Sequence, residues 1–151
     1  MPAVSPDGER IAFTAAATER DTDRLFVRPL NAATATEIPV QGLNVHSPFW
    51  SPDGRQIAFN SRGTLERVDL SGGPPLTICS CNGIGGTWNR DGVILSTNTS
   101  RLLYRVSAAG GDPKPLLPLA EGEAAQMWPD SESILTLSLA GDIVRCFLKR
   151  R

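Results

Sequence analysis

A single sequence pattern occurs at four places in this chain of 151 residues, and it restricts the fold more than any other feature. It reads VSPDGERIAF at residues 4–13 and WSPDGRQIAF at residues 50–59, and shorter copies read WNRDGVIL at 88–95 and WPDSESIL at 128–135. The tryptophans of the chain, Trp50, Trp88 and Trp128, all take the first position, where the first copy has Val4. Repetition at a spacing of 38 to 46 residues is typical of an array of equivalent structural units.

Each copy indicates a tight turn between two short strands. In Ser-Pro-Asp-Gly, at residues 5–8 and 51–54, Ser suits the first turn position, Pro fixes φ at the second, Asp suits the third and Gly tolerates the left-handed conformation that follows. The next apolar residues, Ile-Ala-Phe in two copies, alternate as in a β-strand. A second motif, at 65–73 and 103–111, predicts a third strand that ends in Gly-Gly. The proline-rich segments at 74–78 and 113–117 predict a fourth strand at a sheet edge.

Units of four strands and about 40 residues are typical of β-propeller blades, which stack because one small sheet cannot bury both of its faces. We therefore expect one all-β domain over residues 1–151, with antiparallel repeats at approximately 2–47, 48–85, 86–125 and 126–151. The last repeat offers strands at 126–128, 133–139 and 142–148 and no fourth strand. The sequence predicts an open partial propeller of about four blades, the last incomplete, with a small closed four-blade ring as the alternative. The tryptophans are expected to be largely buried between neighbouring blades.

The pattern Trp-Ser-Pro-Asp-Gly-x-x-Ile-Ala-Phe resembles the TolB-like, WD40-like propeller repeat of many bacterial proteins, and the resemblance covers nearly the whole chain. The third unit, with GGTWNRDGVIL at 85–95, LYRV at 103–106 and Gly-Gly at 110–111, is similar to the C-terminal propellers of serine/threonine protein kinases of soil bacteria. In that setting the propeller is a sensor region that follows a membrane helix and lies outside the cytoplasm. The resemblance implies no catalytic residue in this chain, because no kinase motif is present.

Charge and hydropathy exclude several classes of protein. Fifteen Lys and Arg stand against sixteen Asp and Glu, a net charge of -1, which excludes a strongly basic nucleic-acid binder. The terminal Lys149-Arg150-Arg151 is too short for a nucleic-acid or membrane patch. No apolar run approaches the roughly 18 residues of a membrane span, and residues 1–6 show no secretion signal. We expect no nucleic-acid partner and no membrane insertion by this segment.

The three cysteines, Cys79, Cys81 and Cys146, are too few and too unevenly spaced for a disulfide framework. A zinc site would need all three together with His46, the single histidine, and Cys-x-Cys lacks the second pair that would support it. We therefore expect the cysteines to act as small, half-buried apolar side chains, and we expect no metal and no cofactor.

The recurring acidic residues are interpreted as turn residues. Asp7, Asp53, Asp91 and Asp130 recur at one repeat position, the first three followed by Gly8, Gly54 and Gly92. Paired carboxylates could serve acid–base chemistry or a metal, but copies on successive blades are a blade width apart, and the turn explains them all. There is no G-x-S-x-G elbow, and the glycines at 83–86 lack the Lys-Ser/Thr of a phosphate loop. The sequence predicts no catalytic residue.

Asn44 and His46 are the candidate binding residues. They precede the second copy of the repeat, so they are expected on the loop between two blades, where propellers usually bind their ligands. His46 is not part of the repeat, since Ile84 and Ala124 take its position in the following units. An exposed loop histidine without a function is the alternative.

The leading hypothesis for function is a non-catalytic module that binds a protein or a small ligand, as the sensor region of a bacterial serine/threonine kinase. One alternative is the accessory propeller of a prolyl-oligopeptidase-type or other TolB-associated hydrolase, and another is a nonfunctional fragment. The kinase resemblance implies a place outside the cytoplasm, and the chain is otherwise expected inside it. Open blade edges are expected to favour self-association.

Overall fold

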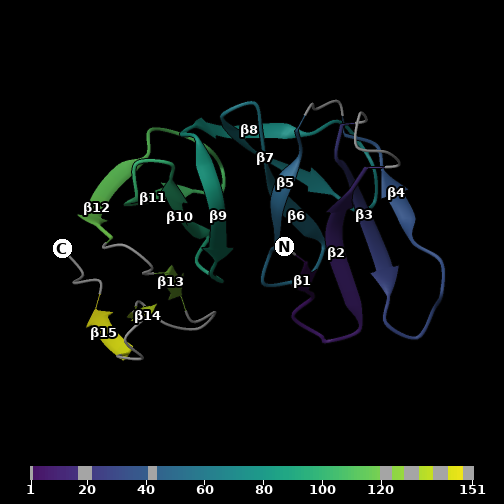
Figure 1. Ribbon diagram of the computed structural model, residues 1–151, viewed down its shortest axis with the longest axis horizontal. Helices are drawn as coiled ribbons and strands as arrows, with labels where there is room; N and C mark the ends of the chain where they lie inside the picture. The colour runs from purple at the N-terminus through teal and green to yellow at the C-terminus, as the bar shows by residue number, and fades with distance from the viewer. Residues whose placement is uncertain are drawn as a thin grey trace.

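The structure, a computed structural model, describes residues 2–16, 22–40, 44–119, 124–127, 133–137 and 143–147, the last three ranges by their backbone. These residues form strands, turns and irregular segments and include no helix, so none that is long and apolar enough to cross a membrane. The strands make four antiparallel sheets (Figure 1). The prediction of an all-β fold is confirmed.

Each sheet is built from consecutive strands. The first sheet holds β1 (Ala3–Val4), β2 (Arg10–Ala15), β3 (Arg24–Pro29) and β4 (Thr36–Ile38). The second holds β5 (His46–Trp50), β6 (Gln56–Ser61), β7 (Thr64–Asp69) and β8 (Leu76–Ser80). The third holds β9 (Gly83–Trp88), β10 (Val93–Asn98), β11 (Leu102–Ser107) and β12 (Lys114–Pro118). The fourth has three strands in the described residues, β13 (Ala124–Met127), β14 (Ser133–Leu137) and β15 (Ile143–Phe147).

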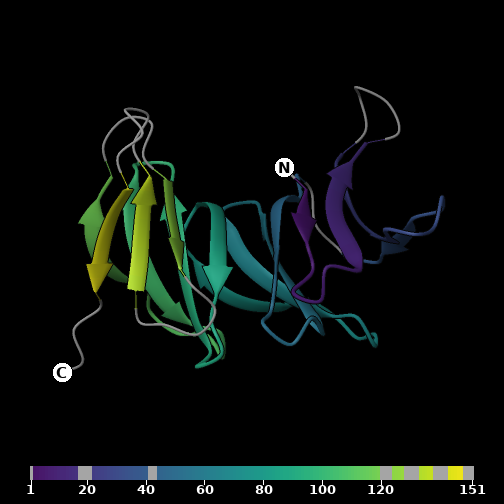
Figure 2. The same cartoon turned by 90° about the horizontal axis from the view of Figure 1, so that it is seen from below.

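The sheets follow one another around an arc. Strands that are neighbours in the sequence are hydrogen-bonded neighbours in each sheet, so every sheet is an up-and-down meander. The first strands β1, β5, β9 and β13 lie on the inner side of the arc, and β4, β8 and β12 lie on its outer side (Figure 1). The sheets stand side by side, and the first and the last occupy opposite ends without meeting (Figures 1 and 2). This is the open propeller arrangement that the repeats predict.

The repeat turn, which joins the first and second strands of a sheet, is closed by side-chain hydrogen bonds. In the second sheet the Ser51 hydroxyl donates to Asp53 Oδ1 at 2.6 Å and accepts from the N–H of Gln56 at 2.9 Å. Asp53 Oδ1 also accepts from the N–H of Arg55 at 3.1 Å. Gly54 follows with φ of +67°, which a side chain would strain. The residues Ser-x-Asp-Gly therefore specify the turn, as the sequence indicates.

The third repeat turn reaches the same shape with another capping residue. Asn89 takes the place of the serine, and its Oδ1 accepts from the N–H groups of Asp91 and Val93 at 3.1 and 2.9 Å. Gly92 again has a positive φ, +71°. The short polar side chain of Asn or Ser can hydrogen-bond to nearby backbone in such turns, so the substitution preserves the turn.

The apolar core lies between sheets, because successive side chains of a strand point to opposite faces. From β6, Ile57 and Phe59 pack against the first sheet, with Leu25 and Val27 among their neighbours. Ala58, between them in the sequence, packs against the third sheet. Full burial of a side chain such as Phe59, 0% exposed, contributes about 1.5–3 kcal/mol.

The interface between the second and third sheets has a different composition. Phe49, Leu65 and Ile78 of the second sheet pack against Ile94 and Val106 of the third. The inner strands approach closely here, because a Cβ on Gly86 would lie 2.8 Å from both the Leu95 carbonyl oxygen and the Phe49 ring. The two described interfaces therefore share the repeat register but differ in the side chains that fill them.

The sheets begin a few residues earlier than the repeat boundaries drawn from the sequence. The inner strands β5, β9 and β13 start at His46, Gly83 and Ala124, whereas the boundaries lie at 48, 86 and 126. The repeated motif begins only at the tryptophan, so the preceding half of each inner strand carries little recurring sequence. In the first sheet Val4, in the tryptophan position, is 57% exposed at the open end of the arc.

Candidate functional site

The two candidate binding residues lie at the start of the inner strand β5. Asn44 is exposed, with φ of +58°, a conformation that asparagine tolerates better than most residues. His46 differs from the expectation of a loop residue: it is the first residue of β5 and pairs with Asn60 of β6. The ladder then shifts register between His46 and Phe49, and Ser47 within this irregularity has φ of +52°. The histidine is half-buried, with Nδ1 3.2 Å from Ser47 Oγ.

A buried polar cluster lies behind this end of the inner strands. Asn60 of β6, Ser96 of β10 and Tyr104 of β11 are 1%, 1% and 3% exposed. They meet around Gly83, the first residue of β9, where an added Cβ would lie 2.9 Å from both Ser96 Oγ and the Tyr104 hydroxyl and closer still to Asn60 Oδ1. A glycine at this position therefore allows polar groups from the second and third sheets to converge.

Several atoms of this cluster have no hydrogen-bond partner among the described residues. They are both amide atoms of Asn60 and the hydroxyl oxygen of Tyr104, whereas Ser96 donates to the Gly85 carbonyl oxygen. Burial raises the pKa of Tyr104. Because buried polar groups are nearly always hydrogen-bonded, this cluster is suited to a bound polar molecule or water that joins the two sheets. No motif in the sequence predicts this cluster, although Asn60 and Ser96 interrupt apolar strands.

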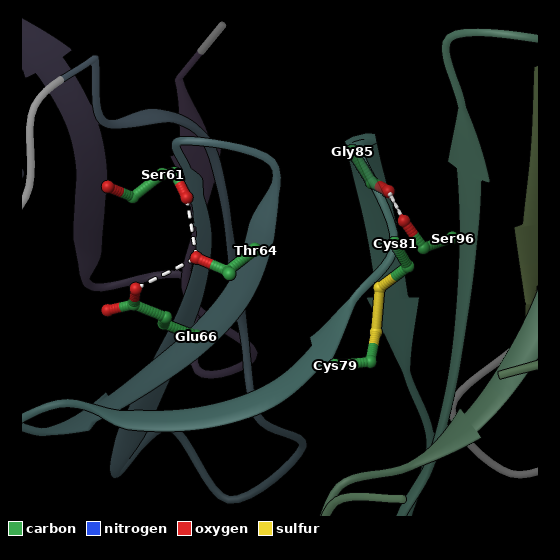
Figure 3. Close-up of a disulfide and its surroundings, with 7 residues drawn as sticks. All are labelled: Ser61, Thr64, Glu66, Cys79, Cys81, Gly85 and Ser96. Atoms are coloured by element: carbon green, nitrogen blue, oxygen red, sulfur yellow. Dashed lines mark hydrogen bonds between the residues drawn. A yellow bond between two sulfur atoms is a disulfide. The ribbon is translucent and has the colours of Figure 1, made fainter. Parts of the chain in front are cut away.

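A disulfide lies beside the same interface. Cys79 of β8 and Cys81, which follows the strand, are bonded to each other, with their Cα atoms 5.6 Å apart (Figure 3). Both belong to the apolar cluster between the second and third sheets and are 6% and 9% exposed. The expectation of unpaired apolar cysteines is therefore wrong for this pair. The backbone brings the two side chains together where the chain leaves the outer strand β8 for the inner strand β9, a change of direction that spacing alone does not reveal.

The tryptophan positions differ in exposure. Trp50 is 7% exposed, its Nε1–H donates to the Ala3 carbonyl oxygen of the first sheet at 2.9 Å, and the Arg10 guanidinium lies 4.9 Å from its ring centroid. Trp88 packs against the next interface but is only half-buried, less than expected. Trp128 lies outside the described residues, as does the fourth turn aspartate.

The turn aspartates use their carboxylates locally. A hydrogen bond from the Ser5 hydroxyl and another from the N–H of Glu9 lower the pKa of Asp7. The equivalent bonds from Ser51 and the N–H of Arg55 lower the pKa of Asp53. No group of three or more His, Cys, Asp or Glu side chains in the described part of the chain is placed to hold a metal ion.

Comparison with solved structures shows the fold. The chain is similar to TolB from Acinetobacter baumannii, with a TM-score of 0.65, 19% identity, and coverage of 95% of this chain and 41% of that protein. A protein assigned as TolB from Agrobacterium tumefaciens gives a TM-score of 0.75, 16% identity, and coverage of 95% and 64%. Virginiamycin B lyase from Staphylococcus aureus gives a TM-score of 0.60 and 17% identity, with coverage of 97% of this chain and 54% of that protein. No protein-family model and no curated protein matches the chain.

These structures are β-propellers, so the chain is a β-propeller module. It spans 41% to 64% of the length of the proteins it matches. At 16% to 19% identity the likeness concerns the fold alone, which hosts many unrelated activities. The TolB-like character of the repeat, expected from its sequence, agrees with two of these neighbours.

Proposed function

We propose that this chain is a non-catalytic propeller segment that binds a protein or a small ligand on the face of the arc where the inner strands β5 and β9 begin. The observation that carries this proposal is the buried cluster of Asn60, Ser96 and Tyr104, which lies behind His46. Within it, both amide atoms of Asn60 and the Tyr104 hydroxyl lack hydrogen-bond partners in the described part of the protein. Rigid sheets that hold unsatisfied polar groups near an exposed strand end are suited to recognition.

The Cys79–Cys81 disulfide supports a location outside the cytoplasm. Disulfides persist in oxidising compartments and are rare in the bacterial cytosol. This agrees with the resemblance of the third repeat to the extracytoplasmic propellers of bacterial serine/threonine kinases. We therefore propose a sensor segment of such a kinase, with the catalytic domain in another part of the polypeptide.

Thiol trapping in the producing cell tests the location. Cells are acid-quenched, free thiols are alkylated, and the peptide with both cysteines is analysed by mass spectrometry before and after reduction. We expect alkylation of Cys79 and Cys81 only after reduction, and we expect protease added to intact spheroplasts to digest the protein. A cytoplasmic enzyme serves as the protected control. Free thiols together with protection from protease would contradict an extracytoplasmic sensor.

Binding at the polar cluster is tested separately with Ser96→Ala and Tyr104→Phe. Both variants keep the packing while removing hydroxyl groups. Hydrogen exchange of the Gly83 and Gly85 amides, compared between purified protein and protein in native membrane extract, reports occupancy of the site. We expect slower exchange in the extract for the unaltered chain and little difference for the double variant. Equal exchange rates for the unaltered chain and the double variant, both purified and in extract, would show that the cluster is not a binding site.

A further inference from the structure

The contact between the first and second sheets includes an arginine that covers a tryptophan. The Arg10 guanidinium lies 4.9 Å from the ring centroid of Trp50, and its Nη2 donates to the Gly54 carbonyl oxygen at 2.9 Å. The same nitrogen lies 3.4 Å from Asp7 Oδ2 in its own repeat turn. The guanidinium of Arg10 is therefore held by two groups of the second sheet, the Trp50 ring and the Gly54 carbonyl oxygen. The Asp7 carboxylate of the first sheet, to which Arg10 itself belongs, also holds it.

The equivalent position in the second sheet holds a glutamine. Gln56 aligns with Arg10 in the repeat, and its side chain is bonded within its own sheet. Its Oε1 accepts from Arg67 Nη1 at 2.8 Å, and its Nε2 donates to Asp69 Oδ2 at 3.3 Å. Gln56 therefore does not reproduce the contact of Arg10, and Trp88 is half-buried where Trp50 is buried.

A groove of about 340 Å³ lies at this position between the second and third repeat turns. Its walls are the counterparts of the residues around Arg10: Ser51, Pro52, Asp53 and Gln56 from the second sheet, and Trp88, Asn89, Arg90 and Gly92 from the third. These turns lie at the far end of the inner strands from His46. The groove is thus a surface separate from the polar cluster.

The groove offers the groups that hold a guanidinium. Trp88 presents an aromatic ring, and Trp is the side chain that attracts a cation most strongly. Asp53 uses Oδ1 for the hydrogen bonds of its turn, just as Asp7 does, and Asp7 uses Oδ2 to meet Arg10. Hydrogen bonds from Ser51 and the Arg55 N–H lower the pKa of Asp53, so the carboxylate is ionised at neutral pH.

We propose that this groove binds an arginine side chain of a partner polypeptide, in the way that Arg10 is bound at the preceding interface. The planar guanidinium can lie on the indole ring while it donates to a carboxylate and to turn carbonyl groups, which an ammonium group does less well. Arg90 takes the place of Pro52 in the third turn and contributes a like charge at one side of the groove. The inference extends the proposed binding function to a second surface and does not depend on the polar cluster.

The test follows the indole N–H resonances of Trp50 and Trp88 by NMR while ¹⁵N-labelled protein is titrated with N-acetyl-L-arginine methylamide. We expect the Trp88 resonance to shift and that of Trp50 to remain. The citrulline analogue, which is neutral and of the same shape, should bind about tenfold more weakly. Equal shifts from both compounds would overturn the proposal.

Matched variants test whether the probe binds in the groove beside Trp88. Gln56→Arg supplies the guanidinium from within the chain and should weaken binding of the probe at least about tenfold, while Arg10→Gln should make the Trp50 resonance respond as well. An unchanged Trp50 resonance in the Gln56→Arg variant reports an intact fold. Unchanged binding by this folded variant would overturn the proposal.

Free L-arginine distinguishes the source of the guanidinium. It carries an α-ammonium and an α-carboxylate that a residue within a polypeptide lacks. We expect it to bind no more tightly than the blocked methylamide. Binding at least about tenfold tighter would overturn the polypeptide source and assign the groove to a free amino acid. The result of the thiol and protease experiments does not affect binding at the groove. The proposal of an extracytoplasmic sensor and the proposal of an arginine-binding groove can therefore fail independently.

Discussion

Replacing Trp50 and Trp88 by alanine should have unequal effects on stability, although the two residues occupy the same repeat position. Trp50→Ala removes a side chain that is 7% exposed, together with its hydrogen bond to Ala3 and its contact with Arg10. Loss of a large buried aromatic side chain costs about 3–5 kcal/mol. Trp88 is half-buried, so we expect Trp88→Ala to cost about half as much, on the order of 1.5–2.5 kcal/mol.

Trp50→Phe separates the contribution of packing to stability from that of the Trp50 hydrogen bond. The phenyl ring retains much of the packing but cannot donate to the Ala3 carbonyl oxygen, so loss of the hydrogen bond should account for about 0.5–1.5 kcal/mol of its cost. Trp88→Phe is the matched control, and its cost should be smaller because that ring is already partly exposed.

Urea denaturation followed by far-UV circular dichroism measures these free energies. The dependence on urea must be the same in all variants for the comparison to hold, since a changed slope indicates a changed unfolding reaction. In an array of sheets each substitution reports mainly on the interface that it touches. If Trp88→Ala costs as much as Trp50→Ala, the two sites are equally packed and the reasoning about Gln56 and the groove is refuted.

Other predictions concern the same sheets. Gly86→Ala should cost about 1–3 kcal/mol of stability, measured by urea denaturation, because its Cβ would lie 2.8 Å from a carbonyl oxygen of β10. Hydrogen bonds from Ser51 and a turn N–H lower the pKa of Asp53, so its ionised carboxylate stabilises the fold above pH 3.8 and this contribution is lost as the pH falls through the lower folded pKa. Asp53→Asn should therefore reduce stability at neutral pH and flatten its decline below pH 3.8, and parallel acid titrations of both proteins would contradict this. Because the disulfide closes a very short loop, its reduction should cost no more than about 1.5 kcal/mol of stability, as thermal melts of the oxidised and reduced proteins will show. Light scattering on dilute protein should reveal self-association through the open ends of the arc, whereas a stable monomer would point to ends that are covered.

The sequence predicts the architecture well because the residues of each repeat specify the turn and the strands of that repeat. Ser51, Asp53 and Gly54 specify a local hairpin, and their periodic return specifies stacked sheets. Trp88 instead lines a groove together with a residue of the preceding repeat, Gln56, and no local pattern shows that Gln56 is bonded within its own sheet.

Other features of the candidate sites depend on where the chain changes direction. His46 lies in a strand because the inner strand begins before the recurring motif does. The pairing of Cys79 with Cys81 and the meeting of Asn60 with Tyr104 around a glycine both require the passage from an outer to an inner strand. The polar contacts join residues of different sheets, and the disulfide forms where the chain turns between two sheets, so composition and spacing carry little information about either.

The alternation of side chains along β6 has a consequence for how such a protein changes over generations. Ile57 and Phe59 belong to one interface and Ala58 to the next, so a substitution at one of them is compensated by partners on a single neighbouring sheet. Each interface can then accumulate its own substitutions independently of the others. The first and second repeats already differ in this way, with Arg10 in one and Gln56 in the other, so one junction of such a chain can change while the remaining junctions keep their packing.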